Sequence, residues 1–386
     1  MAMLNINNVV TISVLVPPAG LPNYSINNLV CFTRDTPAVS LGTDLYRAYA
    51  TAADVFTDWG ASDTYNAAVS VFSQSPNILT GGGLFLVVPM LAGEVLGNAL
   101  NRAQAYAYFG GCAPTFASGA SGMSGYTGAT AANLEYHQAA ETAQAAGKLL
   151  FLSTDDIASL TTGGLAHEVH DEGLSLCRVL HHTVAAQIKA FKWAYASRGM
   201  STNFAGSNTA STLHLKSLAG VSADDGLTQN IYNSAAAVGA DIYANVAGVA
   251  CVQSFGENEF FDDVYNLRWI VGALEVAGFN YLRQSSTKIP QTEIGMDGLK
   301  AAYRRVCAQA ITNGFIAAGL WTGSDTFGDP QDFNRNISDF GYYIWSLPVA
   351  QQPVADRNSR IAPIIQIALK YRGALHHTDV IVTVNK

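Results

Sequence analysis

The end of the sequence alternates between apolar and polar side chains, and this pattern constrains the fold more than any other stretch does. Three valines share one face of the run that starts at Thr378: Val380, Val382 and Val384. A period of two with β-branched residues is typical of a half-buried β-strand. Since no sequence follows that could form a hairpin with it, we expect its partner strand to come from far back in the chain or from another molecule.

The start of the sequence shows the same alternation. Its apolar residues are Val10, Ile12, Val14 and Val16, and the pair Pro17 and Pro18 ends the run. Two terminal strands would present two unpaired edges. Two interpretations stay open: the ends pair with each other inside one subunit, or they add to the sheets of neighbouring copies through main-chain hydrogen bonds.

The chain is poor in charge for its size. Of its 386 residues, 49% are hydrophobic and only 13% are charged, about half the charged share of an average globular domain. A soluble monomer needs a charged surface, so this composition favours a large assembly in which partners cover much of the surface; a tightly packed monomer stays open as the alternative. The net charge of −8 offers no basic surface for nucleic acid.

The cysteines and the apolar runs indicate the compartment. Five cysteines are spread along the chain without a CxxC pair: Cys31, Cys112, Cys177, Cys251 and Cys307. We interpret them as small buried hydrophobic residues in a reducing compartment. No secretory signal opens the sequence and no apolar run reaches membrane length, so we expect a chain that is made and assembled in a cytoplasm, without membrane insertion.

Strand-like and helix-like segments alternate through the chain. Strands are expected at 26–32, 84–88, 148–153, 177–182, 212–215 and 342–345. Helices are expected at 52–59 after an N-cap at Thr51, from Ser62 to Pro76 with Tyr65, Val69 and Phe72 buried, and at 92–103, 131–146, 165–174 and 183–196. A Gly/Ser-rich stretch at 118–128 is expected to be a loop. This rhythm predicts an α/β fold with a largely parallel sheet.

Two long helices are expected toward the end of the chain. The first runs from Asp262 or Asp263 to Gly278, and Val264, Leu267, Val271 and Leu274 share one apolar face of it. The second runs from Asp297 to Asn313, with Leu299, Tyr303, Val306 and Ala310 on one face. The opposite face of the second helix carries Lys300, Arg304 and Arg305, a local concentration of positive charge in a charge-poor chain.

Metal-binding and catalytic patterns are weak. His167, Glu168, His170 and Glu172 fall close together, and His181 and His182 follow on the next predicted strand, but the spacing is not HExxH. We favour a polar helix end over a metal site there, and a structural role for His376 and His377. No GxSxG motif and no defensible acid–base pair is present, so the sequence argues against an enzyme and indicates no cofactor.

Several blocks of sequence together resemble the contractile tail sheath proteins of bacteriophages. The blocks are AADVFTDWG (52–60), YNAA (65–68), FSQSP (72–76), LHLKSLAGV (213–221), GADIY (239–243), GV (248–249), FFDDV (260–264) with Trp269, and YRGALHH (371–377). Each block alone is weak, and their order and spacing carry the resemblance.

The resemblance implies a tail-sheath-like α/β (α+β) core with a layered α/β insertion and extended terminal β-strand arms. The implied parts are an N-terminal arm (1–20), a first core part (21–91), an outward-facing inserted α/β domain (92–200), an inner second core part (201–372) and a C-terminal arm (373–386). The arms would enter neighbouring subunits and complete their sheets.

The resemblance also implies a structural role in the virion. Subunits would form hexameric discs, stack helically around the tail tube, meet baseplate and tail terminator proteins, and contract to drive the tube through the host envelope. Five cations are candidates to face the tube: Arg357, Arg360, Lys300, Arg304 and Arg305. The alternatives are another phage tail or baseplate protein, or a cytoplasmic α/β metalloenzyme with ligands at His167 and His170.

Overall fold

The chain folds into two compact units. The computed structural model describes residues 26–42, 45–104, 106, 109–112, 131–256, 260–285 and 287–378. Among these, the first unit, here called the sheet unit, spans Ser25–Trp269, Thr312–Phe315 and the segment from Tyr371 on, and the second, the C-terminal unit, spans Ile270–Ile311 and Ile316–Lys370. The valines predicted for both terminal strands and the loop predicted at 118–128 lie outside the described residues.

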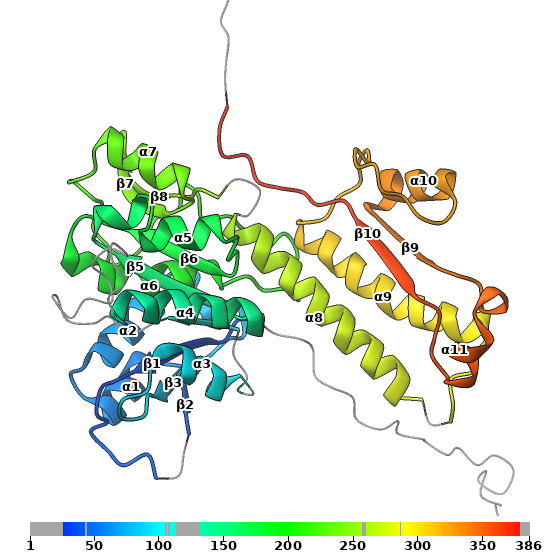
Figure 1. Ribbon diagram of the computed structural model, residues 1–386, viewed down its shortest axis with the longest axis horizontal. Coiled ribbons are helices and arrows are strands. Elements are labelled where there is room, and N and C mark those ends of the chain that lie inside the picture. Colours follow the sequence, from blue (N-terminus) through cyan, green and yellow to red (C-terminus); the bar gives the residue numbers. More distant parts are fainter. Residues whose placement is uncertain are drawn as a thin grey trace, which may run out of the picture. The chain divides into compact units, whose positions relative to one another are not determined.

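An eight-stranded sheet organises the sheet unit (Figure 1). Its order is β2 (Arg47–Tyr49), β3 (Phe85–Pro89), β1 (Leu29–Thr33), β4 (Gly110–Cys112), β5 (Leu149–Thr154), β6 (Cys177–His181), β7 (Asp241–Val246) and β8 (Val249–Gln253). The six central strands pair in parallel, and the edge strands β2 and β8 pair antiparallel. The predicted α/β class with a largely parallel sheet is confirmed.

Helices cover both faces of this sheet. They are α1 (Ala52–Trp59), α2 (Asp63–Phe72), α3 (Leu96–Ala103), α4 (Ala131–Ala146), α5 (Leu165–Asp171), α6 (Ala185–Gly199) and α7 (Gln229–Ala237). Helices α3, α4, α5 and α7 share one apolar core with side chains of β1, β3, β5 and β6. On the other face α2 packs on α6, and α6 on β5, so that aromatic rings such as Phe151 and Tyr195 meet. Burial on both faces explains why these strands are continuous apolar runs and do not alternate.

Two predicted helix starts are confirmed by their caps. The hydroxyl of Thr51 accepts a hydrogen bond from the amide of Asp54, and that of Ser62 accepts one from the amide of Tyr65. Side-chain acceptors of this kind satisfy amides that the first helical turn leaves without partners. The hydrophobic pattern assigned the wrong face to α2, however, because Val69 is exposed whereas Ala67, Ala68 and Val71 are buried.

Other boundaries differ from the prediction. Residues 212–215 form no strand: Leu215 adopts a positive φ of 60° in a turn, although its amide bonds to Val252 of β8. The helix predicted to begin at residue 92 begins at Leu96. The sheet takes strands from both sides of residue 92; which parts of the chain face outward or inward in an assembly stays a prediction.

The C-terminal unit holds the end of α8 (Phe261–Arg283), α9 (Glu293–Asn313), α10 (Pro330–Phe340), α11 (Val354–Asn358) and a two-stranded sheet of β9 (Tyr342–Ser346) and β10 (Ile365–Leu369). Helix α8 was predicted to end at Gly278, but it continues to Arg283. Gly278 faces Tyr303 of α9 so closely that a Cβ atom there would lie 2.6 Å from the Tyr303 hydroxyl. Gly298 of α9 faces Tyr281 of α8 in the same way, so each glycine admits a tyrosine of the other helix.

The apolar face predicted for α8 is not the one that the structure buries. Leu267 and Val271 are exposed, while Tyr265, Trp269 and Ile270 are buried. Both sides of this helix are apolar, and the larger aromatic side chains occupy the interior since they remove more surface from water. None of the described helices is long and apolar enough to cross a membrane.

Candidate assembly surface

The two-stranded sheet of the C-terminal unit has two different faces. In the antiparallel register Ala368 lies opposite Tyr343, and Ile367 opposite Ile344. Tyr343, Trp345 and Ala368 point to one side, where Phe333 and Ile337 of α10 complete a small apolar cluster. Phe327 stacks on Tyr343 with ring centroids 5.5 Å apart, so this face is closed by aromatic packing.

The opposite face is apolar but only half covered. It carries Tyr342, Ile344, Ile365, Ile367 and Leu369, each of intermediate burial. Burial raises the pKa of the Tyr342 phenol, and the positive charge of Arg304 on α9 opposes this effect.

Both outer edges of the sheet lack a partner strand among the described residues. Two-stranded sheets are marginally stable in water, and a third strand or a packed helix is needed to hold them. Here α9 and α10 supply the packing, while the main-chain donors and acceptors along the two edges remain open to further strands.

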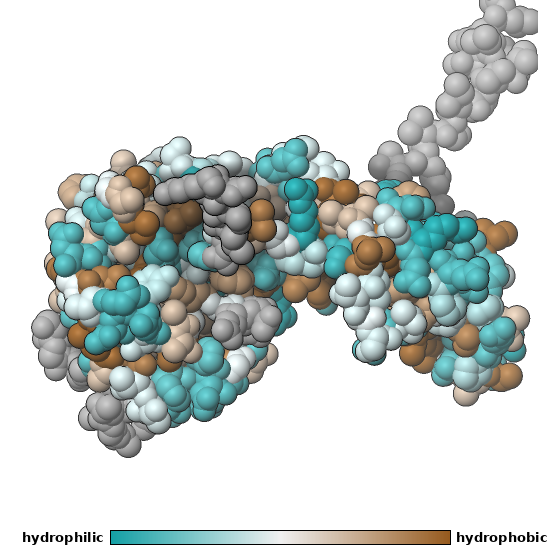
Figure 2. Space-filling view, turned by 90° about the horizontal axis from the view of Figure 1, so that it is seen from above, coloured by the Kyte–Doolittle hydropathy of each residue, from teal (hydrophilic) through white to brown (hydrophobic). Residues whose placement is uncertain are grey.

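Large apolar side chains are exposed on the C-terminal unit. They are Val271, Phe279, Leu282, Ile294, Leu320, Phe340, Val354, Ile361 and Ile364. Ile294 and Ile364 are each 80% exposed. Figure 2 shows hydrophobic and hydrophilic residues side by side on the face that it presents. Exposed apolar surface of this extent is typical of a surface that a partner covers.

The five predicted tube-facing cations lie on α9 and at the end of α11. Lys300 lies on α9 and pairs with Asp297 at 3.0 Å. Arg304 and Arg305 are exposed on the same helix, and the Nε of Arg305 donates to the carbonyl of Ala301. Arg357 on α11 and Arg360 just beyond it are also exposed. Within the described part of the chain, no hydrogen bond or ion pair joins these two arginines to the cations of α9.

The segment Tyr371–Thr378, which leads into the predicted terminal strand, is anchored on the sheet unit. The amide of Arg372 donates to the carbonyl of Phe315 at 2.8 Å. Further along, Thr212 Oγ1 lies 2.9 Å from His376 Nε2, and Phe260 packs edge-on against the His376 ring. These contacts fit the structural role expected for His376, although no sequence pattern indicated its partners.

Acidic groups lie under this segment. Burial, reinforced by the charge of Asp263, raises the pKa of Asp262 to about 6. Burial also raises the pKa of Tyr371, which hydrogen-bonds to Asp263. The side of the sheet unit that receives the segment therefore contains one carboxyl group, that of Asp262, whose protonation changes near pH 6.

The ligands of the metalloenzyme alternative are not brought together. His181 is fully buried on β6, and His182 is held by the carbonyl of Ser222 and the amide of Val184. His167 lies 3.4 Å from Glu168 on α5. In the described ranges, only Glu172 of the predicted segment joins a group of three ligand-type side chains.

A comparison with known families identifies the C-terminal third of the chain. Residues 261–384 match the family described as E217 tail sheath protein gp31-like, C-terminal domain. No curated protein matches the chain. The matched range contains α8 to α11, both strands of the small sheet and the segment anchored by His376. Residues 261–384 are therefore similar to the C-terminal domain of a gp31-like tail sheath protein, and this match confirms the resemblance of the chain to phage tail sheath proteins.

Proposed function

We propose that this protein is the subunit of a contractile phage tail sheath, which polymerises as hexameric rings around the tail tube and drives the tube through the host envelope. The family match over residues 261–384 carries the proposal. The matched family is structural, and the proposal requires no cofactor and no catalytic residue. Assembly in the host cytoplasm and contacts with the baseplate and tail terminator proteins belong to the same proposal.

The incomplete sheet of the C-terminal unit supports strand exchange between subunits. β9 and β10 offer two open edges, and the sequence has two alternating terminal stretches, at Val10–Val16 and Val380–Val384. A strand added to an edge forms main-chain hydrogen bonds that depend little on side-chain identity. We propose that the terminal arms of neighbouring subunits add to this sheet and link the rings.

The exposed apolar residues support burial in a polymer. Ile294, Leu320 and Ile364 contribute large apolar side chains to the surface of the C-terminal unit. Burying such a side chain contributes on the order of 1.5–3 kcal/mol, so a few of them suffice to favour association. The low charge of the whole chain is in keeping with this.

The cations on α9 and α11 are proposed to face the tube. A sheath must hold its tube during assembly and release it on contraction. Exposed ion pairs contribute only ~0–1 kcal/mol each and are screened by salt, so Arg304, Arg305, Arg357 and Arg360, with Lys300, would provide a contact that is weak enough to break.

Electron microscopy of two purified chains tests the proposal. The full chain is expected to form long hollow tubes with regular striations. A chain that ends at Thr378 keeps the His376 anchor and loses the predicted arm strand, so it should stay folded, as judged by circular dichroism, and form no tubes.

Tubes of normal length from the shortened chain would contradict the arm proposal. If the full chain forms no tubes by itself, the purified tail tube protein is added. Failure to coat that tube would contradict the sheath proposal and favour another tail or baseplate component.

A further inference from the structure

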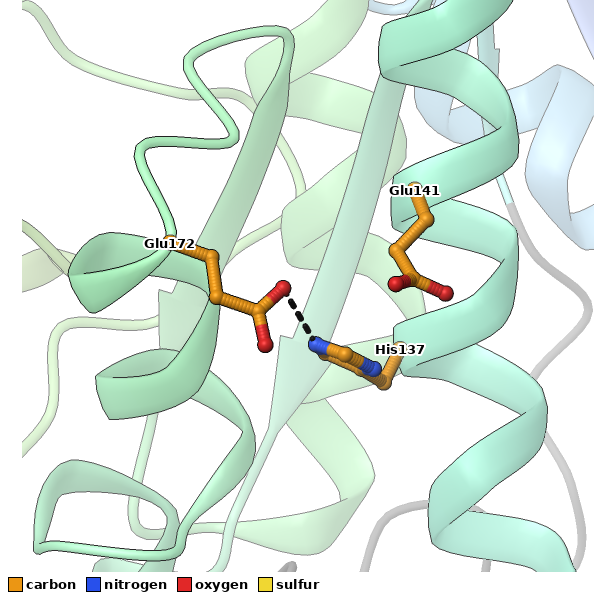
Figure 3. Close-up of side chains that lie close together, drawn as sticks. All are labelled: His137, Glu141 and Glu172. Atoms are coloured by element: carbon orange, nitrogen blue, oxygen red, sulfur yellow. Dashed lines mark hydrogen bonds and ion pairs between the residues drawn. The ribbon is translucent and has the colours of Figure 1, made fainter.

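Three side chains of the sheet unit converge between α4 and α5 (Figure 3). They are His137, Glu141 and Glu172, and each places one ligand-type atom within 4.8 Å of those of the other two. His137 Nε2 lies 2.9 Å from Glu172 Oε2. This group lies outside the residues matched by the sheath family and outside the assembly surface described above.

Local structure explains the convergence. His137 and Glu141 are four residues apart on α4, a spacing that puts two side chains on one face of a helix. Glu172 is the C-cap residue of α5, and its amide bonds to the carbonyl of Glu168, which fixes its backbone where the helix ends. Helices α4 and α5 contact each other on the same face of the sheet, so the end of α5 lies beside the middle of α4.

The three side chains differ in their exposure to solvent and in their contacts. His137 is 9% exposed, whereas Glu141 and Glu172 are exposed to solvent. Glu172 is balanced by its contact with the imidazole, but Glu141 forms no hydrogen bond or ion pair with any residue in the described ranges. Two carboxylates that lie close together repel each other unless a cation lies between them. The buried imidazole would provide an ion with one fixed ligand, and the two exposed carboxylates leave the site accessible from water.

We propose that His137, Glu141 and Glu172 bind a divalent transition-metal ion, with Zn²⁺ as the probe, that ties α4 to α5. Imidazole nitrogen and carboxylate oxygen are both common zinc ligands, at about 2.0–2.2 Å from the ion. Water would complete the coordination, because three protein ligands leave a position open. Such an ion would add bonds from three side chains on two helices to what the His137–Glu172 contact provides.

The test is calorimetric titration of ZnCl₂ into metal-free full-length protein. The expected result is one site per chain in the wild type. That site is lost in Glu141→Gln, which removes one charge from an exposed side chain, and in His137→Ala. The matched controls are Glu275→Gln, an exposed glutamate on α8, and His167→Ala on α5; both should keep the site.

A second readout separates binding from loss of fold. Bound Co²⁺ gives visible absorption bands whose intensity reports inner-sphere ligands, and the wild type should show them while Glu141→Gln does not. The melting temperature should rise with zinc concentration in the wild type and in both controls, but not in Glu141→Gln. The proposal would be overturned by wild-type protein that takes up no zinc, or by a Glu141→Gln variant that binds zinc like the wild type. The contact between His137 and Glu172 would then be an ion pair without a metal.

Discussion

The imidazole rings of His214 and His376 stack in the sheet unit, with centroids 4.5 Å apart and an angle of 19° between their planes. His214 comes from the turn beside β8, and His376 from the segment that leads to the predicted C-terminal arm. The amide of Ser254 donates to His214 Nδ1. This hydrogen bond requires an unprotonated Nδ1, so the His214 ring of the stacked pair is neutral.

The anchor of the terminal segment is therefore expected to weaken in acid. Burial lowers the pKa of both His214 and His376. The charge that His376 and Lys216 can carry lowers the pKa of His214 further, whereas Asp263 and Asp241 oppose the effect of burial at His376. The unfolded chain takes up a proton near pH ~6.5, and the folded chain does so at a lower pH. Between the two values the unfolded state binds more protons, so the free energy of unfolding falls as the pH drops.

Histidine NMR titration checks this expectation. Resonances assigned to His214 and His376 by their loss in His214→Ala and His376→Ala should titrate with midpoints below ~6.5. Hydrogen exchange of residues 371–378, corrected for the intrinsic rate, should speed up below that pH. Midpoints at or above the value of free histidine would contradict the buried, neutral pair.

Replacing Asp262 by Asn should stabilise the protein at neutral pH. The folded-state pKa of about 6 lies above the usual aspartate value because the side chain is buried beside Asp263. The folded state therefore favours the protonated acid, and stability is lost as the pH rises through the window from ~4 to ~6. Asp262→Asn has no such loss, so its advantage should grow across this window to about 2 kcal/mol at pH 7.

Urea unfolding at pH 4 and pH 7 measures this difference. Asp339→Asn makes the same chemical change at an exposed position and should leave the free energy of unfolding within ~0.5 kcal/mol of the wild type at both pH values. An Asp262→Asn variant that is less stable than the wild type at pH 7 would show that the ionised carboxylate is favoured by its surroundings.

Asp241→Asn should be strongly destabilising. Asp241 is 1% exposed and accepts hydrogen bonds from the Tyr195 and Ser254 hydroxyls and from the Phe255 amide. Its charge also attracts the buried guanidinium of Arg178. Asparagine weakens this attraction and puts an amide nitrogen where a carboxylate oxygen accepts hydrogen bonds, and a buried donor that loses its acceptor costs about 1–3 kcal/mol.

An exposed pair gives the contrast. Asp332 and Arg335 pair at 2.7 Å on the surface of α10, and Asp332→Asn should lower the free energy of unfolding by less than ~1 kcal/mol. Denaturant unfolding of the two variants beside the wild type compares them directly. Equal losses would mean that Arg178 finds another partner when Asp241 is neutral.

Local signals predicted local structure well. Thr51 and Ser62 cap their helices because each hydroxyl accepts a hydrogen bond from the amide three residues later, a local contact that does not depend on the tertiary structure. The face of α8 was mispredicted because two of its sides are apolar, and only the tertiary structure decides which one packs inward. The contact of Thr212 with His376 joins residues 164 positions apart, and no pattern of local spacing contains that information.

For the candidate sites, too, local features could be predicted from the sequence, whereas contacts between distant residues could not. The first strand of the small sheet was predicted at 342–345, but the second was not, and their pairing depends on the chain reversal through η4 (Val349–Gln351) and α11. The spacing of His137 and Glu141 on one helix was a readable signal of a shared face. Their convergence with Glu172, which lies 35 residues from His137, required the packing of α4 on α5.

Ile364→Asp is expected to block polymerisation without unfolding the subunit. Ile364 is 80% exposed just before β10, so a carboxylate there stays solvated in the free subunit and should change its stability by less than ~0.5 kcal/mol. In a polymer that covers this side chain the carboxylate would lose its water. Negative-stain microscopy should show no tubes for Ile364→Asp and normal tubes for the control Ile364→Val. Normal tubes from Ile364→Asp would mean that this part of the surface stays open to solvent in the polymer.

The turn between α10 and β9 should tolerate no side chain at Gly341. This residue ends α10 with a φ of 77° and bonds its amide to the carbonyl of Ile337. A Cβ there would lie 2.5 Å from the carbonyl carbon of Ala317, a backbone atom that cannot rotate away. The left-handed conformation alone costs roughly 1–2 kcal/mol for alanine, and the clash adds to it. Gly319→Ala in the same unit is the control, since its Cβ would meet only Lys370 at 3.6 Å. Denaturant unfolding should show that Gly341→Ala lowers the free energy of unfolding by at least about 2 kcal/mol, and that Gly319→Ala changes it little. Comparable stability of the two variants would mean that β9 can shift to make room and that this turn does not hold the small sheet rigidly.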